Sequence, residues 1–110
     1  MASIESRVVT ERDSLEALRD RLRAFARERS WEQFHTPKNL TTAIAGEAGE
    51  LAAVLQWASA DEDLAQYMAA LEEEIADILI YLVRLCDVAG IDPIDAANAK
   101  VERNARRFPA

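Results

Sequence analysis

Two short stretches of this chain place acidic residues three positions apart inside apolar sequence. The stretches read GEAGELAAVLQW and EEEIADILIYLV, and the paired acids in them are Glu47, Glu50, Glu74 and Asp77. On an α-helix, residues three apart lie on one face, close enough for their carboxylates to bind a single cation. If the two helices pack against each other, four carboxylates meet in one place. The spacing therefore predicts a metal site.

The helical period places these acids on the apolar side of their helices. In the first stretch Glu47 falls in the middle of the apolar stripe and Glu50 at its edge, while in the second Glu74 and Asp77 share a side with Ile78. Buried carboxylates must pair with arginine, take up protons or bind a divalent cation. Oxygen ligands alone favour Mg²⁺ or Mn²⁺ over zinc. Because E-x-x-E is common on acidic helices, spacing alone leaves open that the acids simply face solvent.

A di-iron centre is a second way for a helical protein to use clustered glutamates. Such centres use a Glu-x-x-His pair on each of two helices. This chain has one histidine, His35, and its single match, from Glu32 to His35, lies outside any expected helix. The missing second copy argues against di-iron.

Four helices are expected to position these acids. Apolar periodicity and end signals predict them at about residues 14–29, 40–57, 64–89 and 93–106. Pro37 after Thr36 and Pro93 after Asp92 suit helix starts, and Gly90 suits a helix end. The chain shows no repeat and no strand-like alternation. These patterns predict an all-α fold, a four-helix bundle unit.

Composition limits the kind of protein. The chain has 110 residues, which suits one domain at residues 13–110 after a flexible segment at 1–12. A net charge of −7 argues against a nucleic-acid polymer as partner, although a metal ion can still bridge acids to a single nucleotide. The lone cysteine, Cys86, suits the reducing cytoplasm. The longest apolar run, 78–83, is far short of the roughly 20 residues of a membrane span, so no membrane contact is expected.

Four blocks of sequence occur in a recognisable order: WEQFHTPKNL, GEAGELAAVLQW, EEEIADILIYLV and KVERNARRFP. Together they resemble the MazG-like all-α nucleoside triphosphate pyrophosphohydrolases, and most of all the dCTP pyrophosphatase branch. The resemblance covers roughly residues 13–109, and the family motif, E-x-x-E followed by E-x-x-D, falls on the four acids above. It implies a helical unit that assembles as a homo-oligomer, either a dimer or a tetramer. The apolar surface of the segment 75–85, which one short chain can scarcely cover, agrees with such an assembly.

The resemblance also implies an activity. It is the Mg²⁺-dependent hydrolysis of deoxynucleoside triphosphates, with dCTP and modified dCTP favoured, to the monophosphate and pyrophosphate, a house-cleaning of the nucleotide pool. Mg²⁺, or Mn²⁺ as a substitute, would bind the four acids and offset the charge of the triphosphate. Glu47 or Glu50 would accept the proton of the attacking water. The alternative is a non-catalytic nucleotide-binding or regulatory oligomeric module, although such a module has little need for all four acids.

Nine further residues match nucleotide-binding positions of the family: Trp31, His35, Lys38, Asn39, Trp57, Tyr81, Lys100, Asn104 and Arg107. By resemblance, the aromatic side chains line the base and sugar, the basic ones meet the phosphates, and Asn104 offers an amide to the base edge. Tryptophans at these positions are also ordinary core or subunit contacts, and His35 can be a hydrogen-bonded strut. Leu22 departs from the pattern, because cytosine-preferring members carry a histidine there and leucine cannot hydrogen-bond a base.

Overall fold

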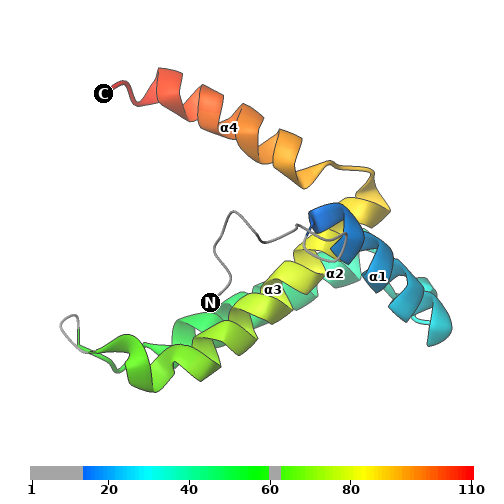
Figure 1. The fold of residues 1–110 in the computed structure, drawn as a ribbon, viewed down its shortest axis with the longest axis horizontal. Coiled ribbons are helices and arrows are strands. Elements are labelled where there is room, and N and C mark those ends of the chain that lie inside the picture. The colour runs from blue at the N-terminus through cyan, green and yellow to red at the C-terminus, as the bar shows by residue number, and fades with distance from the viewer. Residues whose placement is uncertain (1–13, 60–62) are drawn as a thin grey trace, which may run out of the picture.

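The described residues of the chain form helices and the turns between them. The structure, a computed structural model, describes residues 14–59 and 63–110, so the predicted flexible segment 1–12 lies outside it. Within the described residues no strand occurs, which confirms the all-α prediction. The elements, in chain order (Figure 1), are α1 (Leu15–Glu28), η3 (Glu32–Phe34), α2 (Pro37–Val54), η4 (Leu64–Tyr67), α3 (Met68–Ala89) and α4 (Pro93–Arg107).

Local capping chemistry sets most helix ends where the sequence predicts them. Ser14 caps α1 by accepting a hydrogen bond from the Ala17 amide at 3.0 Å. Asp92 caps α4 in the same way, with Pro93 as its first residue. α3 ends at Gly90, whose φ of 71° lies in the left-handed region that glycine adopts without strain.

Three predicted boundaries are wrong by about one turn. α2 begins at Pro37, because Thr36 accepts a hydrogen bond from the Asn39 amide at 3.1 Å, and it ends at Val54 rather than at Trp57. The predicted third helix is divided, since Leu64–Tyr67 forms a separate 3₁₀ turn before α3. Trp57 therefore lies in the turn after α2 and is not part of that helix.

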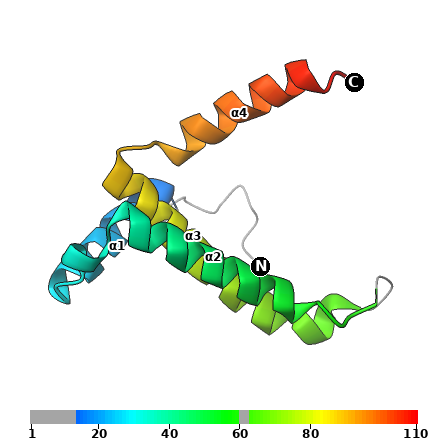
Figure 2. The same cartoon turned by 180° about the vertical axis from the view of Figure 1, so that it is seen from behind.

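The packing centres on α3. α2 and α3 run antiparallel side by side, and α1 packs against the C-terminal part of α3 (Figures 1 and 2). One buried apolar residue from each of the three helices marks the small core: Ala26, Leu40 and Val83. No helix of the described residues is long and apolar enough to cross a membrane.

α4 stands apart from this three-helix unit. It leaves the end of α3 and extends away from the α2–α3 pair (Figure 1). Its apolar residues Ile94 and Val101, and Phe108 directly after its end, are all more than half exposed. On α3, Ile75, Leu79 and Leu82 are likewise exposed on a face that neither α1 nor α2 covers. A single chain therefore leaves open the surface that the apolar sequence of α3 predicts to be buried.

Candidate functional site

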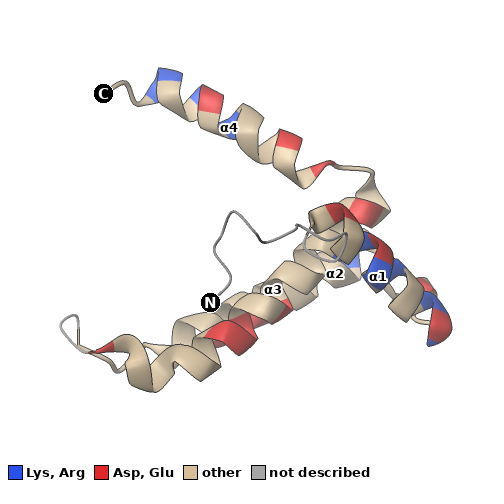
Figure 3. Cartoon of the chain, in the orientation of Figure 1, with Lys and Arg blue, Asp and Glu red and all other residues tan. Residues whose placement is uncertain are grey.

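The acidic residues of α2 and α3 meet midway along the helix pair. Glu47 and Glu50 of α2 and Glu74 of α3 each place a carboxylate oxygen within 4.8 Å of the others. The two E-x-x-E/D pairs can face each other because the helices are antiparallel and closely packed. Figure 3 shows the acidic stretch of α3 against an otherwise largely uncharged helix pair, whereas α1 carries charges of both signs along its length. The predicted convergence is therefore realised for three of the four acids.

The buried oxygens of this cluster have no hydrogen-bond partner. Oε2 of Glu47 and Oε2 of Glu74 are both shielded from solvent and unsatisfied. None of the ion pairs among residues 14–59 and 63–110 includes Glu47, Glu50 or Glu74. Leaving such oxygens unpaired in a folded protein is costly. Pairing with arginine is thus excluded for the described residues, and protons or a cation must neutralise the acids.

The pKa values of Glu47 and Glu74 are both raised, so the charged forms of these carboxylates are disfavoured. Burial, followed by the negative charge of Glu50, raises the pKa of Glu47 to about 7. Burial is also the largest cause of the raised pKa of Glu74. A divalent cation can replace these protons, because each carboxylate then gains an opposite charge. Three converging carboxylates with two unsatisfied oxygens fit a hard cation such as Mg²⁺ or Mn²⁺.

Asp77 lies one turn after Glu74 on α3 and is half-buried. It is outside the group of three whose oxygens converge. Its negative charge nevertheless adds to the raised pKa of both Glu47 and Glu74, after the larger effect of burial. Its role as a fourth ligand stays a prediction.

The predicted nucleotide-binding residues fall into separate regions of the chain. Trp31, His35, Lys38 and Asn39 lie before or at the start of α2, whereas Trp57 lies beyond its other end. The 18 residues of α2 span about 27 Å at 1.5 Å per residue. The two tryptophans of one chain therefore cannot stack on the same base.

The predicted α4 residues share a face but lie on the helix that extends away. Lys100, Asn104 and Arg107 follow the spacing of four and three that places side chains on one side of a helix. Figure 2 shows α4 separated from α2, where the acids Glu47 and Glu50 lie. Within one chain, the structure does not bring these three residues to the acidic cluster. Tyr81, in contrast, lies on α3 one turn beyond Asp77 and is half-buried.

The segment between α1 and α2 is held by several local contacts. Trp31 packs edge-on against Phe25 with ring centres 5.6 Å apart, and Arg29 lies 3.4 Å over the Phe25 ring. The Asn39 side chain donates to the Phe34 carbonyl at 3.0 Å, so it supports this segment directly. Trp31 remains 44% exposed and presents part of its ring to solvent.

Comparisons with known proteins agree with this arrangement. Residues 35–110 match the MazG nucleotide pyrophosphohydrolase domain. The chain belongs to the MazG nucleotide pyrophosphohydrolase family. This membership confirms the resemblance that the four sequence blocks predict, and the helical fold is the one expected of the family.

Two relatives and one solved structure are similar to this chain over most of its length. It is 46% identical over 101 residues to dCTP pyrophosphatase 1 of Bos taurus and 45% identical over 102 residues to that of Homo sapiens. These matches cover 87% and 88% of this chain, which spans about 60% of the length of either relative. The crystal structure of a pyrophosphatase from Archaeoglobus fulgidus has a TM-score of 0.85 and 44% identity, covering 94% of this chain and 100% of that one.

Sequence reasoning missed one polar network in this MazG domain. Arg84 of α3 donates from Nε to Nδ1 of His35 at 3.1 Å and from Nη1 to Oδ2 of Asp87 at 3.2 Å. Arg23 of α1 also donates to Asp87, through Nε at 3.0 Å and through Nη2 to the other oxygen. The hydrogen bond from Arg23, and after it the positive charges of Arg23 and Arg84, lower the pKa of Asp87 despite its burial. The available signal was an Arg and an Asp three apart within the apolar run ILIYLVRLCDVAG.

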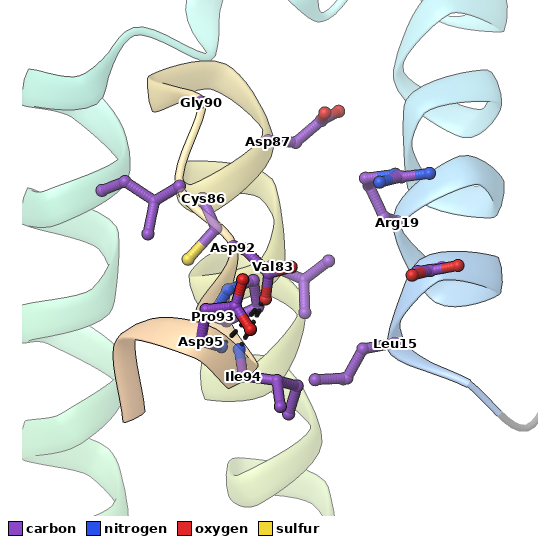
Figure 4. Close-up of a pocket in the computed structure, with 12 residues that line it drawn as sticks. Leu15, Arg19, Val83, Cys86, Asp87, Gly90, Asp92, Pro93, Ile94 and Asp95 are labelled. Carbon is purple, nitrogen blue, oxygen red and sulfur yellow. Dashed lines mark hydrogen bonds between the residues drawn. The ribbon is translucent and has the colours of Figure 1, made fainter. Parts of the chain in front are cut away.

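A cavity of about 530 Å³ lies elsewhere, between the start of α1, the end of α3 and the start of α4 (Figure 4). Its lining includes Arg19, Cys86 and Asp92 but none of the predicted site residues. Burial, with a smaller effect of the Asp92 charge, raises the pKa of Cys86, so this half-buried thiol stays protonated at neutral pH. The cavity is therefore separate from the acidic cluster.

Proposed function

We propose that this protein is a divalent-cation-dependent pyrophosphohydrolase of deoxynucleoside triphosphates, with dCTP and its modified forms as favoured substrates. The observation that carries the proposal is the convergence of Glu47, Glu50 and Glu74, with two buried oxygens that no protein group satisfies. Membership of the MazG family and the names of the relatives, dCTP pyrophosphatase 1, support the same activity.

The residues of the cluster have different roles in such a reaction. Glu47, Glu50 and Glu74, with Asp77 as fourth ligand, would hold Mg²⁺ or Mn²⁺. When bound, the cation would offset the charge of the triphosphate and polarise the phosphorus under attack. Glu50 is the exposed member of the group, whereas Glu47 and Glu74 are half-buried, so water reaches the site past Glu50. One of these two glutamates accepts the proton of the attacking water.

A product assay across the four dNTPs tests the proposal. With Mg²⁺ we expect equal amounts of nucleoside monophosphate and pyrophosphate, dCTP as the fastest substrate, partial replacement by Mn²⁺ and no reaction in EDTA. Release of orthophosphate would show a different bond being cleaved. Tight dNTP binding without hydrolysis in Mg²⁺ would instead favour the non-catalytic binding module. Equal rates for all four bases would contradict the preference for dCTP.

We also propose that a second copy of the chain completes the site. Within the described residues no basic side chain forms an ion pair with these acids, while Lys100, Asn104 and Arg107 lie on an α4 that extends away from them (Figure 1). The exposed apolar faces of α3 and α4 give such an assembly its contact surface. Both features favour a dimer or a tetramer.

Introducing a charge on the exposed face of α3 is expected to dissociate the assembly. Leu79→Glu places a carboxylate among Ile75 and Leu82, where burial against a second copy would leave it unpaired. Sedimentation velocity at micromolar concentration should show a dimer or tetramer for the native chain and a monomer without hydrolysis for Leu79→Glu. The matched control is Glu73→Gln on the same helix, which should keep both assembly and turnover. A native chain that sediments as an active monomer would contradict the proposal.

A further inference from the structure

Arg84 is the only charged residue among the described residues that is buried, with 6% of its surface exposed. It connects α3 to the segment before α2 through its hydrogen bond to Nδ1 of His35. On the same helix it binds Asp87, which Arg23 of α1 also binds. Burying an arginine is costly unless its donors are satisfied, so this network must compensate the burial of Arg84.

The hydrogen bond from Arg84 determines which ring nitrogen of His35 carries the proton. A guanidinium can only donate, so Nδ1 of His35 must accept and must be unprotonated. A neutral imidazole then carries its proton on Nε2. An imidazolium would lose this bond and would place its own N–H against a cation.

The charges that face His35 act in the same direction. Arg84 is the nearest, and Asp87 behind it is already engaged by Arg23, so it only partly offsets the positive charge. Burial, and after it the charge of Arg84, lower the pKa of His35. His35 therefore stays neutral at physiological pH.

The other ring nitrogen is left as a free donor beside an aromatic ring. The described part of the chain shows no partner for Nε2 of His35. The ring centre of His35 lies 6.3 Å from that of Trp31, tilted by 59°. A nucleotide that stacks on the exposed part of Trp31 would bring its own oxygens close to this N–H.

We propose that Arg84 is a positioning residue for nucleotide recognition, which fixes His35 as the neutral Nε2–H imidazole so that it donates a hydrogen bond to an acceptor oxygen of the nucleotide beside Trp31. The inference rests on the proposed function, because it requires a nucleotide at Trp31. Arg84 itself does not touch the nucleotide. It acts by orienting His35 and by keeping its donor available over the physiological pH range.

Nitrogen NMR of the imidazole ring tests the first half of the proposal without any turnover. His35 is the only histidine of the chain, so in tag-free protein its ring signals need no assignment. The native protein should show the Nε2–H tautomer at physiological pH. Arg84→Met should mix the two tautomers and move the pKa of His35 towards its ordinary value of about 6.5. Arg84→Lys, which keeps the charge and a donor, should restore part of the native pattern. An Nδ1–H tautomer in the native protein would overturn the proposal.

Steady-state kinetics test the second half. Arg84→Met should raise KM for dCTP about five- to tenfold, the loss typical of one hydrogen bond, with a smaller change in kcat. Near the ordinary histidine pKa of about 6.5, the KM of this variant should depend on pH more strongly than that of the native enzyme. In a His35→Ala background, Arg84→Met should have no further effect on KM, because Arg84 acts through His35. Additive effects of the two changes would overturn the proposal.

The source of the acceptor oxygen follows from binding measurements. If the base supplies it, Arg84→Met weakens dCMP and dCTP equally. If the phosphates supply it, the variant weakens inorganic triphosphate but leaves deoxycytidine unaffected. The two proposals also fail differently: a native protein that binds no nucleotide contradicts the proposed function, whereas normal hydrolysis with an unchanged KM in Arg84→Met contradicts only the role of Arg84.

Discussion

Replacing Glu47 by glutamine is expected to abolish pyrophosphate release and, at the same time, to stabilise the metal-free protein above neutral pH. Activity is lost because a neutral amide binds Mg²⁺ poorly and cannot accept a proton. Removing one preorganised charged group from an active site lowers kcat by about a hundredfold or more. Stability rises because glutamine occupies the same space without the charge that burial and Glu50 oppose.

The gain in stability should depend on pH. The pKa of Glu47 is raised from 4.5 to about 7, so the folded state holds a proton that the unfolded chain releases at lower pH. The contribution of Glu47 to stability is therefore fully present below about pH 4.5 and is lost as the pH rises through about 7. Glu47→Gln removes this loss. In EDTA, the difference in Tm between Glu47→Gln and the native protein should be larger at pH 8 than at pH 5.

The same experiment should include variants of the other three acids and of a neighbouring acid outside the cluster. Glu50→Gln, Glu74→Gln and Asp77→Asn should each abolish turnover while far-UV circular dichroism shows the native helix content. Glu73→Gln is the matched control, since Glu73 precedes Glu74 on α3 but is exposed and outside the cluster. If two of the four cluster variants keep near-native rates in Mg²⁺, the carboxylate site is wrong.

Removing the indole of Trp57 is expected to raise KM for every dNTP by roughly ten- to a hundredfold, because we expect the Trp57 of a second copy to reach the base that stacks on Trp31 of the first. Stacking of a base on an aromatic ring is worth about 1–3 kcal/mol and tolerates any base. Trp57 is 90% exposed in the turn after α2, so Trp57→Ala should cost the fold little and the change in KM should report on binding alone. Leu64→Ala, another exposed apolar position, is the control and should leave KM unchanged.

Asn104→Ala separates affinity from choice of base. An amide can match one base edge and leave another unpaired, and unpaired polar edges are what reject wrong substrates. This variant should therefore flatten the ranking of the four dNTPs rather than raise all KM values alike. A Trp57→Ala enzyme with native KM, or an Asn104→Ala enzyme with native base preference, would place the base elsewhere.

Much of the local structure could be predicted because its causes are local. The 3.6-residue period placed Glu47 and Glu74 on the apolar sides of their helices, and capping chemistry at Ser14 and Gly90 marked two ends that the structure confirms. The same reasoning misplaced the start of α2, because it weighed the apolar residue Leu40 above the Thr36 cap with its following proline. Family membership was also readable, since the motif spacing belongs to the chain itself.

Only the tertiary structure decided which acids meet and how they are neutralised. Periodicity defines a face of one helix, but the register between α2 and α3 depends on how their side chains pack, and this register brings Glu50 into the group while Asp77 stays outside it. The unsatisfied oxygens of Glu47 and Glu74 likewise exist only once burial removes water from them.

The contact between Arg84 and His35 is the clearest example of a feature that the sequence alone could not predict. The sequence determined that a lone arginine lies within the apolar part of α3 and that the single histidine precedes α2. It could not pair them, because 49 positions separate the two residues and no local rule relates them. The packing of α1 and α2 against α3 brings the guanidinium and the imidazole together, and burial then makes their hydrogen bond matter, because a buried charge without a partner would destabilise the fold.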